Sequence, residues 1–225
     1  MCIRDSYWTD PFKLQKQVDF LEANNDYGLV HHEADYFFQI NGKLIRNHHR
    51  TNRIRISDGF VFEELLRNNN IYTPTVMFKT CLFEHFLAID ENVRNKFLMG
   101  DYVMWLEFSQ HCKFHYLPQS MSTYRVLENS MSKSTSYEKT ILFLNSYFNI
   151  RLFFLKKHPL KNITIEIIEQ WRISSCINCA IMYKKNKEAL HFASNLKINK
   201  WGNLVRRVLV HIPILFRFIL KRKKS

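Results

Sequence analysis

Hydrophobic residues in the first part of the chain recur first at helical spacing. Leu14 and Leu21 lie on one face of a predicted helix over residues 13–24, and we expect this face to meet the core. Lys13 and Gln17 fall outside that face, so the pattern predicts that they meet solvent. A Thr-Asp-Pro sequence precedes the segment and is typical of a helix start.

The next segment has the pattern of short strands. An apolar strand is predicted at residues 27–31. The Asn-Gly pair at 41–42 separates two further runs, 36–39 and 43–46, and predicts a hairpin between them. The stretch 48–55 is polar and basic, which indicates a mobile loop.

Helices and strands continue to alternate up to residue 126. The predicted elements are a helix at 59–67, an edge or bulged strand at 71–78, a helix at 81–89, a helix at 100–110, and strands at 114–117 and 121–126. Short strands mixed with helices, followed by a purely helical region, predict the α/β class.

The chain becomes helical after residue 136, with periodic segments at 137–157, 162–184 and 187–197. A basic and apolar helix is then predicted at 203–220. Its apolar run is too short and too charged to span a bilayer, which takes about 20 apolar residues. Two interpretations stay open: a helix lying in the membrane interface, or a terminal helix docked on the domain.

Charge divides the chain at the same place. Residues 1–130 hold 14 basic and 16 acidic residues, a net charge of −2, whereas residues 131–225 hold 19 and 4, a net charge of +15. The basic character therefore belongs to the C-terminal region, and it favours an anionic partner such as a phospholipid surface.

Cysteine and histidine positions offer little support for a metal site. Five cysteines without framework spacing indicate a reduced, cytosolic protein. The Cys176-x-x-Cys179 pair lies in an apolar helical pattern, which favours two buried thiols over zinc. His31 and His32 are neighbours on a predicted strand and point to opposite faces, so they form a poor chelate.

A candidate for chemistry is the carboxylate of Asp101, which follows Gly100 at a predicted helix start. Glycine permits a tight turn there, and the helix dipole favours a negative charge. Two interpretations follow: Asp101 is an ordinary N-cap, or it is an ionised catalytic base held at the mouth of the helix.

Three segments together resemble the family 2 glycosyltransferases. Residues 6–33, which begin SYWTDPFKLQKQVDFLEANN, resemble the segment that follows the family's acidic metal-binding motif. Residues 73–79, TPTVMFK, resemble its acceptor-side strand. Residues 97–126 resemble its later signature, an acidic residue after Gly, a helix, a short strand and a Tyr-Arg pair. The resemblance covers about residues 5–135, with the signatures in the family's order.

This resemblance implies a GT-A fold and an inverting transfer of a sugar from a nucleotide-diphosphate donor to a hydroxyl group. Many members of the family build bacterial lipopolysaccharide, O-antigen or capsule. The implied acceptor is a saccharide or lipid-linked saccharide, and the implied location is the cytoplasm, peripheral on the inner face of the plasma membrane.

The resemblance also implies roles for five residues. Asp101 matches the base that deprotonates the acceptor hydroxyl. Asp5 matches the ligand of a divalent metal, Mg²⁺ or Mn²⁺, which bridges the donor diphosphate. Tyr124 and Arg125 match a pair near the diphosphate, and Trp8 matches the turn behind the metal motif.

Three departures from the family pattern stand out. Residues 3–6 read IRDS where the family has Glu-Gly-Asp-Asp, and Leu127 stands where the family often has His. The family's preceding βαβ nucleotide-binding half is absent. We therefore expect a partial GT-A domain over 1–135 and a basic helical region over 136–225, forming an N-terminally truncated fragment with little or no activity alone.

Two other functions remain as alternatives. The basic C-terminal half is compatible with a non-catalytic, membrane-associated module. Nucleic-acid binding is disfavoured, because the basic residues follow long apolar helices and match no common reading motif. The sequence also contains no GxGxxG, P-loop or HExxH pattern.

Overall fold

The computed structural model describes residues 6–127, 136–197, 201–213, 216–217 and 219. Its contacts divide the chain into two compact units, Met1–Ser130 and Met131–Ser225, here called unit 1 and unit 2. Unit 1 is mixed α/β and contains a five-stranded mixed sheet, whereas unit 2 is helical. The predicted α/β class with a C-terminal helical region is therefore confirmed.

Unit 1 contains five strands and several helices within its described residues. The strands are β1 (Ser6–Trp8), β2 (Tyr27–Phe38), β3 (Lys43–Ile45), β4 (Met77–Phe78) and β5 (Lys113–Val126). The helices are α1 (Lys13–Ala23), α2 (His48–Thr51), α3 (Phe62–Arg67), α4 (Cys81–Leu87), α5 (Glu91–Arg94) and α6 (Gly100–Phe108), with a 3-10 helix, η1 (Thr73–Thr75).

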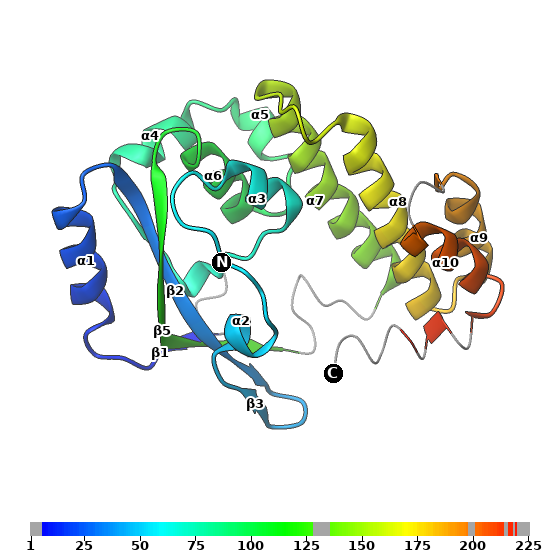
Figure 1. Ribbon diagram of the computed structural model, residues 1–225, viewed down its shortest axis with the longest axis horizontal. Helices are drawn as coiled ribbons and strands as arrows, with labels where there is room; N and C mark the ends of the chain where they lie inside the picture. Colours follow the sequence, from blue (N-terminus) through cyan, green and yellow to red (C-terminus); the bar gives the residue numbers. More distant parts are fainter. Residues whose placement is uncertain (1–5, 128–135, 198–200, 214–215, 218, 220–225) are drawn as a thin grey trace. The chain divides into compact units, whose positions relative to one another are not determined.

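The sheet is built on the long parallel pair β2 and β5 (Figure 1). β1 pairs antiparallel with the free edge of β5, and β3 and β4 pair antiparallel with β2. In Figure 1, α1 lies on one side of the sheet and α3 and α6 lie on the other. Both central strands are therefore covered, which explains the run of seven buried residues in β2.

Helix α1 lies where it was predicted, and its predicted buried face is confirmed at Leu21 but wrong at Leu14, Lys13 and Gln17. Lys13, Gln17 and Leu21 are buried, whereas 44% of Leu14 is exposed. The cause is a polar contact: the Gln17 amide donates to the carbonyl oxygens of Val30 and Thr75. A hydrophobic pattern cannot reveal a face that packs through hydrogen bonds.

Two predictions around the first hairpin had different outcomes. The hairpin is confirmed, since β2 and β3 pair across a turn in which Gly42 has a φ of 67°. The prediction of a mobile loop at 48–55 was wrong, because His48–Thr51 forms α2 and His49 is buried there.

The later strands also differ from their predicted extents. The two strands predicted at 114–117 and 121–126 are one strand, β5. The strand predicted at 71–78 is mostly replaced by η1, with only the two residues of β4 paired to β2. Pro74 explains the change, because proline suits the first turn of a helix and cannot donate within a sheet.

Unit 2 contains four described helices. They are α7 (Tyr137–Lys157), α8 (Ile165–Met182), α9 (Asn186–Ser194) and α10 (Trp201–Leu209). The first has the predicted bounds, and it begins where the Ser136 hydroxyl accepts from Lys139 N. A core of aliphatic residues from α8 and α9, completed by Val210 and Phe216, holds the unit together.

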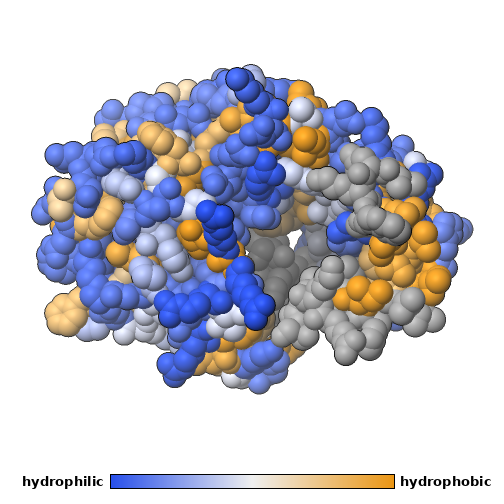
Figure 2. Space-filling model, viewed as in Figure 1, coloured by the Kyte–Doolittle hydropathy of each residue, from blue (hydrophilic) through white to orange (hydrophobic). Residues whose placement is uncertain are grey.

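No described helix is long and apolar enough to cross a membrane. Hydrophobic residues nevertheless gather on the visible surface at the α9–α10 end of unit 2 (Figure 2). Three apolar side chains of this end, Val205, Val208 and Ile212, are each about half exposed.

Candidate active site

Asp101 lies in the first turn of α6, and both of its carboxylate oxygens accept hydrogen bonds. The Thr73 hydroxyl donates to Oδ2 at 2.6 Å, and the Tyr102 N–H donates to Oδ1 at 2.8 Å. The N-cap position is taken by Met99, so the interpretation of Asp101 as the N-cap is wrong. The partly buried carboxylate is held from two elements, η1 and α6, and sits near the positive end of the helix dipole.

Gly100 does not have the role expected from the sequence. Its φ is outside the left-handed region, and a Cβ placed on it would meet no atom within 4 Å. The backbone therefore does not require glycine beside Asp101. Its absent side chain leaves open space next to the carboxylate.

Helix α6 is anchored rigidly behind Asp101. Tyr102, Trp105 and Phe108 are almost wholly buried, and the Tyr102 hydroxyl donates to Leu65 O at 2.6 Å. Since these contacts fix the helix axis and its rotation, the direction of the Asp101 side chain is fixed as well.

The pairing of β1 with β5 brings two predicted site residues onto one face of the sheet. Ser6 lies opposite Tyr124, and Trp8 lies opposite Ser122. Opposed residues in an antiparallel pair share a face, so Trp8 and Tyr124 point to the same side. The Trp8 ring is 55% exposed, whereas Tyr124 is partly buried.

Tyr124 belongs to a cluster of stacked rings that the sequence did not predict. This aromatic cluster comprises Tyr36, His48, His49, Tyr72 and Tyr124. Ring centroids are 3.8 Å apart for Tyr36 and His48, 4.5 Å for His49 and Tyr72, and 4.9 Å for Tyr36 and Tyr124. Its members come from β2, α2, β5 and the segment before η1, so no local sequence signal unites them.

The aromatic cluster is connected to Asp101 through consecutive residues. Tyr72 is a member of the cluster, with its hydroxyl hydrogen-bonded to His48 Nδ1 at 2.8 Å. Thr73, the next residue, donates to Asp101. The structure thus brings Asp101 and Tyr124 into one neighbourhood by way of η1.

Arg125 is placed on the other face of β5 from Tyr124. Its guanidinium carbon lies 5.6 Å from the centroid of the Tyr7 ring. Its Nε is buried and has no hydrogen-bond partner among the described residues. A buried N–H of a charged group without an acceptor is costly, which marks Arg125 as a candidate for binding an anionic ligand.

Lys13, which the sequence pattern predicted to be exposed, is buried next to the Trp8 ring. Lys13 is 1% exposed, its ammonium lies 4.4 Å from the Trp8 ring centroid, and it donates to Gln17 Oε1 at 2.8 Å. Gln17 in turn donates to Thr75 O in η1 at 2.8 Å. These contacts tie the end of β1, through α1, to the short helix that holds Asp101.

The titration of Lys13 yields a testable pH dependence. Burial lowers the pKa of Lys13 from 10.5 to about 8. Between these values the unfolded chain binds more protons than the folded one, so the Lys13 contribution to stability rises with pH. We expect the free energy of unfolding of Lys13→Met, relative to the native chain, to fall by about 3 kcal/mol between pH 8 and 10.5. Urea denaturation at several pH values measures this difference, and a pH-independent difference would contradict the assignment.

Glu33 is a second buried charged residue, and the sequence pattern did not predict its burial. Its carboxylate is 1% exposed and accepts from the N–H groups of Ala34, His49 and Arg50 at 2.8 to 3.1 Å. His49 Nδ1 lies 3.2 Å from Oε1 as well, in poor alignment for a hydrogen bond. Burial alone would raise the pKa of Glu33, but these neighbours outweigh it and lower the pKa to about 2. The carboxylate therefore secures α2, which carries two rings of the aromatic cluster.

The described residues do not form a metal centre. Asp5, the predicted metal ligand, lies outside the described residues, and no group of three His, Cys, Asp or Glu side chains within them could hold an ion. The nearby carboxylate of Asp10 is occupied by Lys16 at 2.6 Å and Phe12 N at 2.8 Å. Within the described part of the chain, the side chains therefore do not form a metal site by themselves.

One cavity of about 470 Å³ opens in unit 1 between α1 and β4, with Leu21 and Phe78 in its wall. None of the predicted site residues lines it. The candidate site is instead the surface formed by Asp101, Thr73 and the aromatic cluster.

No protein-family model matches the chain, and no curated protein matches it. Membership of the family 2 glycosyltransferases therefore stays a prediction that rests on the three sequence segments and on the site described above.

Proposed function

We propose that unit 1 is the acceptor-side part of a GT-A-type, inverting glycosyltransferase. The enzyme would move a sugar from a nucleotide-diphosphate donor to a hydroxyl of a saccharide or lipid-linked saccharide, in the synthesis of bacterial surface polysaccharide. The observation that carries this proposal is the position of Asp101: a carboxylate held by two hydrogen bonds at a helix start, next to a ring cluster that contains Tyr124.

The proposed chemistry of Asp101 is general-base catalysis. Its carboxylate accepts the proton of the acceptor hydroxyl as the hydroxyl oxygen attacks the anomeric carbon of the donor, and the nucleoside diphosphate leaves from the opposite side. The hydrogen bonds from Thr73 and from Tyr102 N–H orient the carboxylate before attack. The open space at Gly100 leaves room for the acceptor.

Tyr124 and the other rings of the aromatic cluster are assigned to substrate binding. The aromatic cluster offers flat surfaces on which the apolar face of a sugar ring packs. Arg125 lies on the opposite face of β5 from Tyr124, so its unpaired buried Nε does not face a donor bound beside Asp101. A divalent metal remains part of the proposal through Asp5 alone, where it would neutralise charge on the diphosphate.

Release of nucleoside diphosphate tests this function. The longest reading frame that contains residues 1–225 is incubated with a panel of nucleotide-diphosphate hexoses, lipid-linked acceptors and Mn²⁺. Acceptor-dependent release for at least one donor supports the proposal. Release that does not depend on any acceptor, or that Asp101→Asn leaves unchanged, would overturn it.

We also propose that unit 2 binds an anionic membrane surface through its C-terminal end. The supporting observation is α10, where Val205, Val208 and the nearby Ile212 are about half exposed and Arg207 is exposed. Apolar side chains together with arginines suit a helix that lies in the interface between lipid and water.

Charge inserted into this apolar group should weaken membrane binding. We expect Val205→Asp/Val208→Asp to reduce flotation with anionic liposomes at least tenfold, because it places two carboxylates against acyl chains and anionic head groups. Leu142→Asp, which changes an equally exposed leucine on α7, is the matched control and should bind normally. Equal loss in both variants, or equal binding to neutral liposomes, would contradict the assignment.

A further inference from the structure

Unit 2 contains a cavity of about 420 Å³ between α7, α8 and α9. It is lined by Asn145, Asn149, Arg172, Ile173, Cys176 and Phe192. This volume falls within the range of about 300–1,000 Å³ that is usual for small-molecule sites. None of these residues has a role in the proposed transfer, and all of them belong to unit 2.

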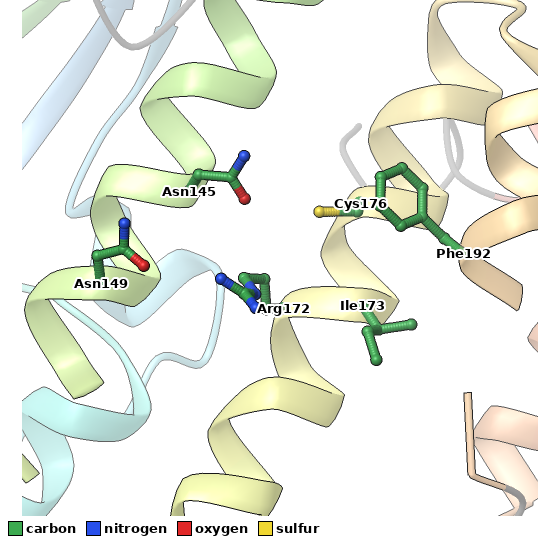
Figure 3. A pocket seen from close by; sticks show the side chains of 6 residues that line it. All are labelled: Asn145, Asn149, Arg172, Ile173, Cys176 and Phe192. Carbon is green, nitrogen blue, oxygen red and sulfur yellow. The ribbon is translucent and has the colours of Figure 1, made fainter. Parts of the chain in front are cut away.

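The polar side chains of the cavity face one another across it (Figure 3). Asn145 and Asn149 project from α7, one helical turn and about 6 Å apart along the axis, toward α8. The guanidinium of Arg172 extends from α8 toward Asn149. Neither amide has a hydrogen-bond partner within the described part of the chain, so both offer donors and acceptors to a ligand.

The charge at this site favours an anion at one end. Of the six lining residues only Arg172 is charged, and residues 131–225 carry a net charge of +15. Arg172 forms a 2.5 Å ion pair with Glu169 one turn before it, but this pair is about one-third exposed and engages only part of the guanidinium. The remaining N–H groups match a carboxylate oxygen.

The opposite end of the cavity is neutral and partly apolar. The Cys176 thiol points toward Asn145, and the Phe192 ring lies beside it (Figure 3). Burial raises the pKa of Cys176 to about 11, so this thiol adds no negative charge at neutral pH. An amide and an aromatic ring in the wall of one cavity suit a ligand ring that carries hydroxyl groups on its edge and C–H groups on its face.

We infer that this cavity binds a sugar that carries a carboxylate, of the hexuronate class. Arg172 and Asn149 hold the carboxylate, while Asn145 and Phe192 contact the hydroxylated ring. All of these residues belong to unit 2, so binding in this cavity does not depend on the transfer proposed for unit 1.

The test uses the full chain and three small probes, with binding followed by NMR shifts of the Ile173 methyl groups. Glucuronate has both the carboxylate and the ring hydroxyl groups, glucose lacks the carboxylate, and cyclohexanecarboxylate lacks the hydroxyl groups. We expect glucuronate to bind with a dissociation constant of about 1 mM, and at least tenfold more tightly than either relative. No shift at about 10 mM glucuronate, or equal affinity for all three probes, would overturn the inference.

Two substitutions with opposite expected effects locate the binding. Arg172→Gln should weaken glucuronate binding at least tenfold, whereas Glu169→Gln should strengthen it a few-fold because it releases the guanidinium. Arg207→Gln removes an exposed arginine of α10, outside the cavity, and should leave binding unchanged. Asn149→Ala changes a second, exposed residue of the site and should also weaken binding. Circular dichroism verifies that each variant is folded. Unchanged affinity in folded Arg172→Gln or in folded Asn149→Ala would refute the site.

Discussion

Asp101→Asn is expected to reduce the proposed sugar transfer by about 10²–10⁴-fold, the usual contribution of a positioned general base. The amide keeps an oxygen that accepts from Tyr102 N–H or Thr73, but it cannot take a proton from the acceptor hydroxyl. The free energy of unfolding should change by only about 1 kcal/mol, because no buried group loses its partner. Initial rates of nucleoside diphosphate release, together with urea denaturation, measure the two effects.

Asp19→Asn is the matched control for this prediction. Asp19 is exposed on α1, and within the described residues its side chain bonds to Gln15, so its substitution should leave the rate unchanged. Thr73→Val should have an intermediate effect, about tenfold, because it removes the hydroxyl that orients Asp101, and Thr73→Ser should restore the rate. If Asp101→Asn keeps the native rate, or loses it only by unfolding, Asp101 is not the base.

Glu33→Gln is expected to lower the free energy of unfolding at pH 7 by about 3 kcal/mol. The value follows from a pKa that falls from 4.5 in the unfolded chain to about 2 in the folded chain, at about 1.4 kcal/mol for each unit. The mutated amide would also place an NH₂ group against N–H donors of Ala34, His49 and Arg50. Urea denaturation measures the loss, and amide hydrogen exchange at His49 and Arg50 should accelerate.

The pH dependence of the free energy of unfolding distinguishes stabilisation by the Glu33 charge from stabilisation by packing. Because the folded pKa of Glu33 is depressed, its stabilisation is present above about pH 4.5 and is lost as the pH falls toward 2. The difference between the native chain and Glu33→Gln should therefore shrink over this range. Glu22→Gln, an exposed change on α1, should cost less than about 0.5 kcal/mol. A difference that persists undiminished near pH 2 would show that the lost stability does not come from the charge.

Features that depend on neighbouring residues in the sequence were predicted well. Helix α7 has the predicted bounds, and the turn at Asn41-Gly42 joins β2 to β3 as expected. Both follow from local rules, namely the helical period of apolar residues and the ability of glycine to adopt a positive φ.

Features that depend on tertiary hydrogen bonds were not predictable from the pattern. Lys13 and Gln17 resemble solvent-facing residues, yet they are buried because their polar groups bond to each other and to the backbone at Thr75. Glu33 resembles a surface acid and instead secures α2. The partners of Gln17 and Glu33 are distant in the sequence, so these contacts form only when the sheet has formed.

In the candidate site, too, single residues could be predicted from the sequence but their tertiary contacts could not. Asp101 and Tyr124 could be selected from the sequence, one at a helix start and one in a short motif. Their connection through Thr73 and Tyr72 could not, because it requires η1 to lie against both α6 and the sheet. Arg125 and Tyr124 are adjacent in the sequence, but the alternation of a strand places them on opposite faces.

The anomeric configuration of the first-formed product tests the central proposal most directly. The longest reading frame that contains this sequence is supplied with an α-linked nucleotide-diphosphate sugar that it consumes, and the coupling constant of the new anomeric proton is recorded by NMR. A general base at Asp101 that activates the acceptor for direct attack predicts a β-linked product, formed at least 100-fold more slowly by Asp101→Asn. An α-linked product, or a product formed equally fast by the variant, would contradict the proposal.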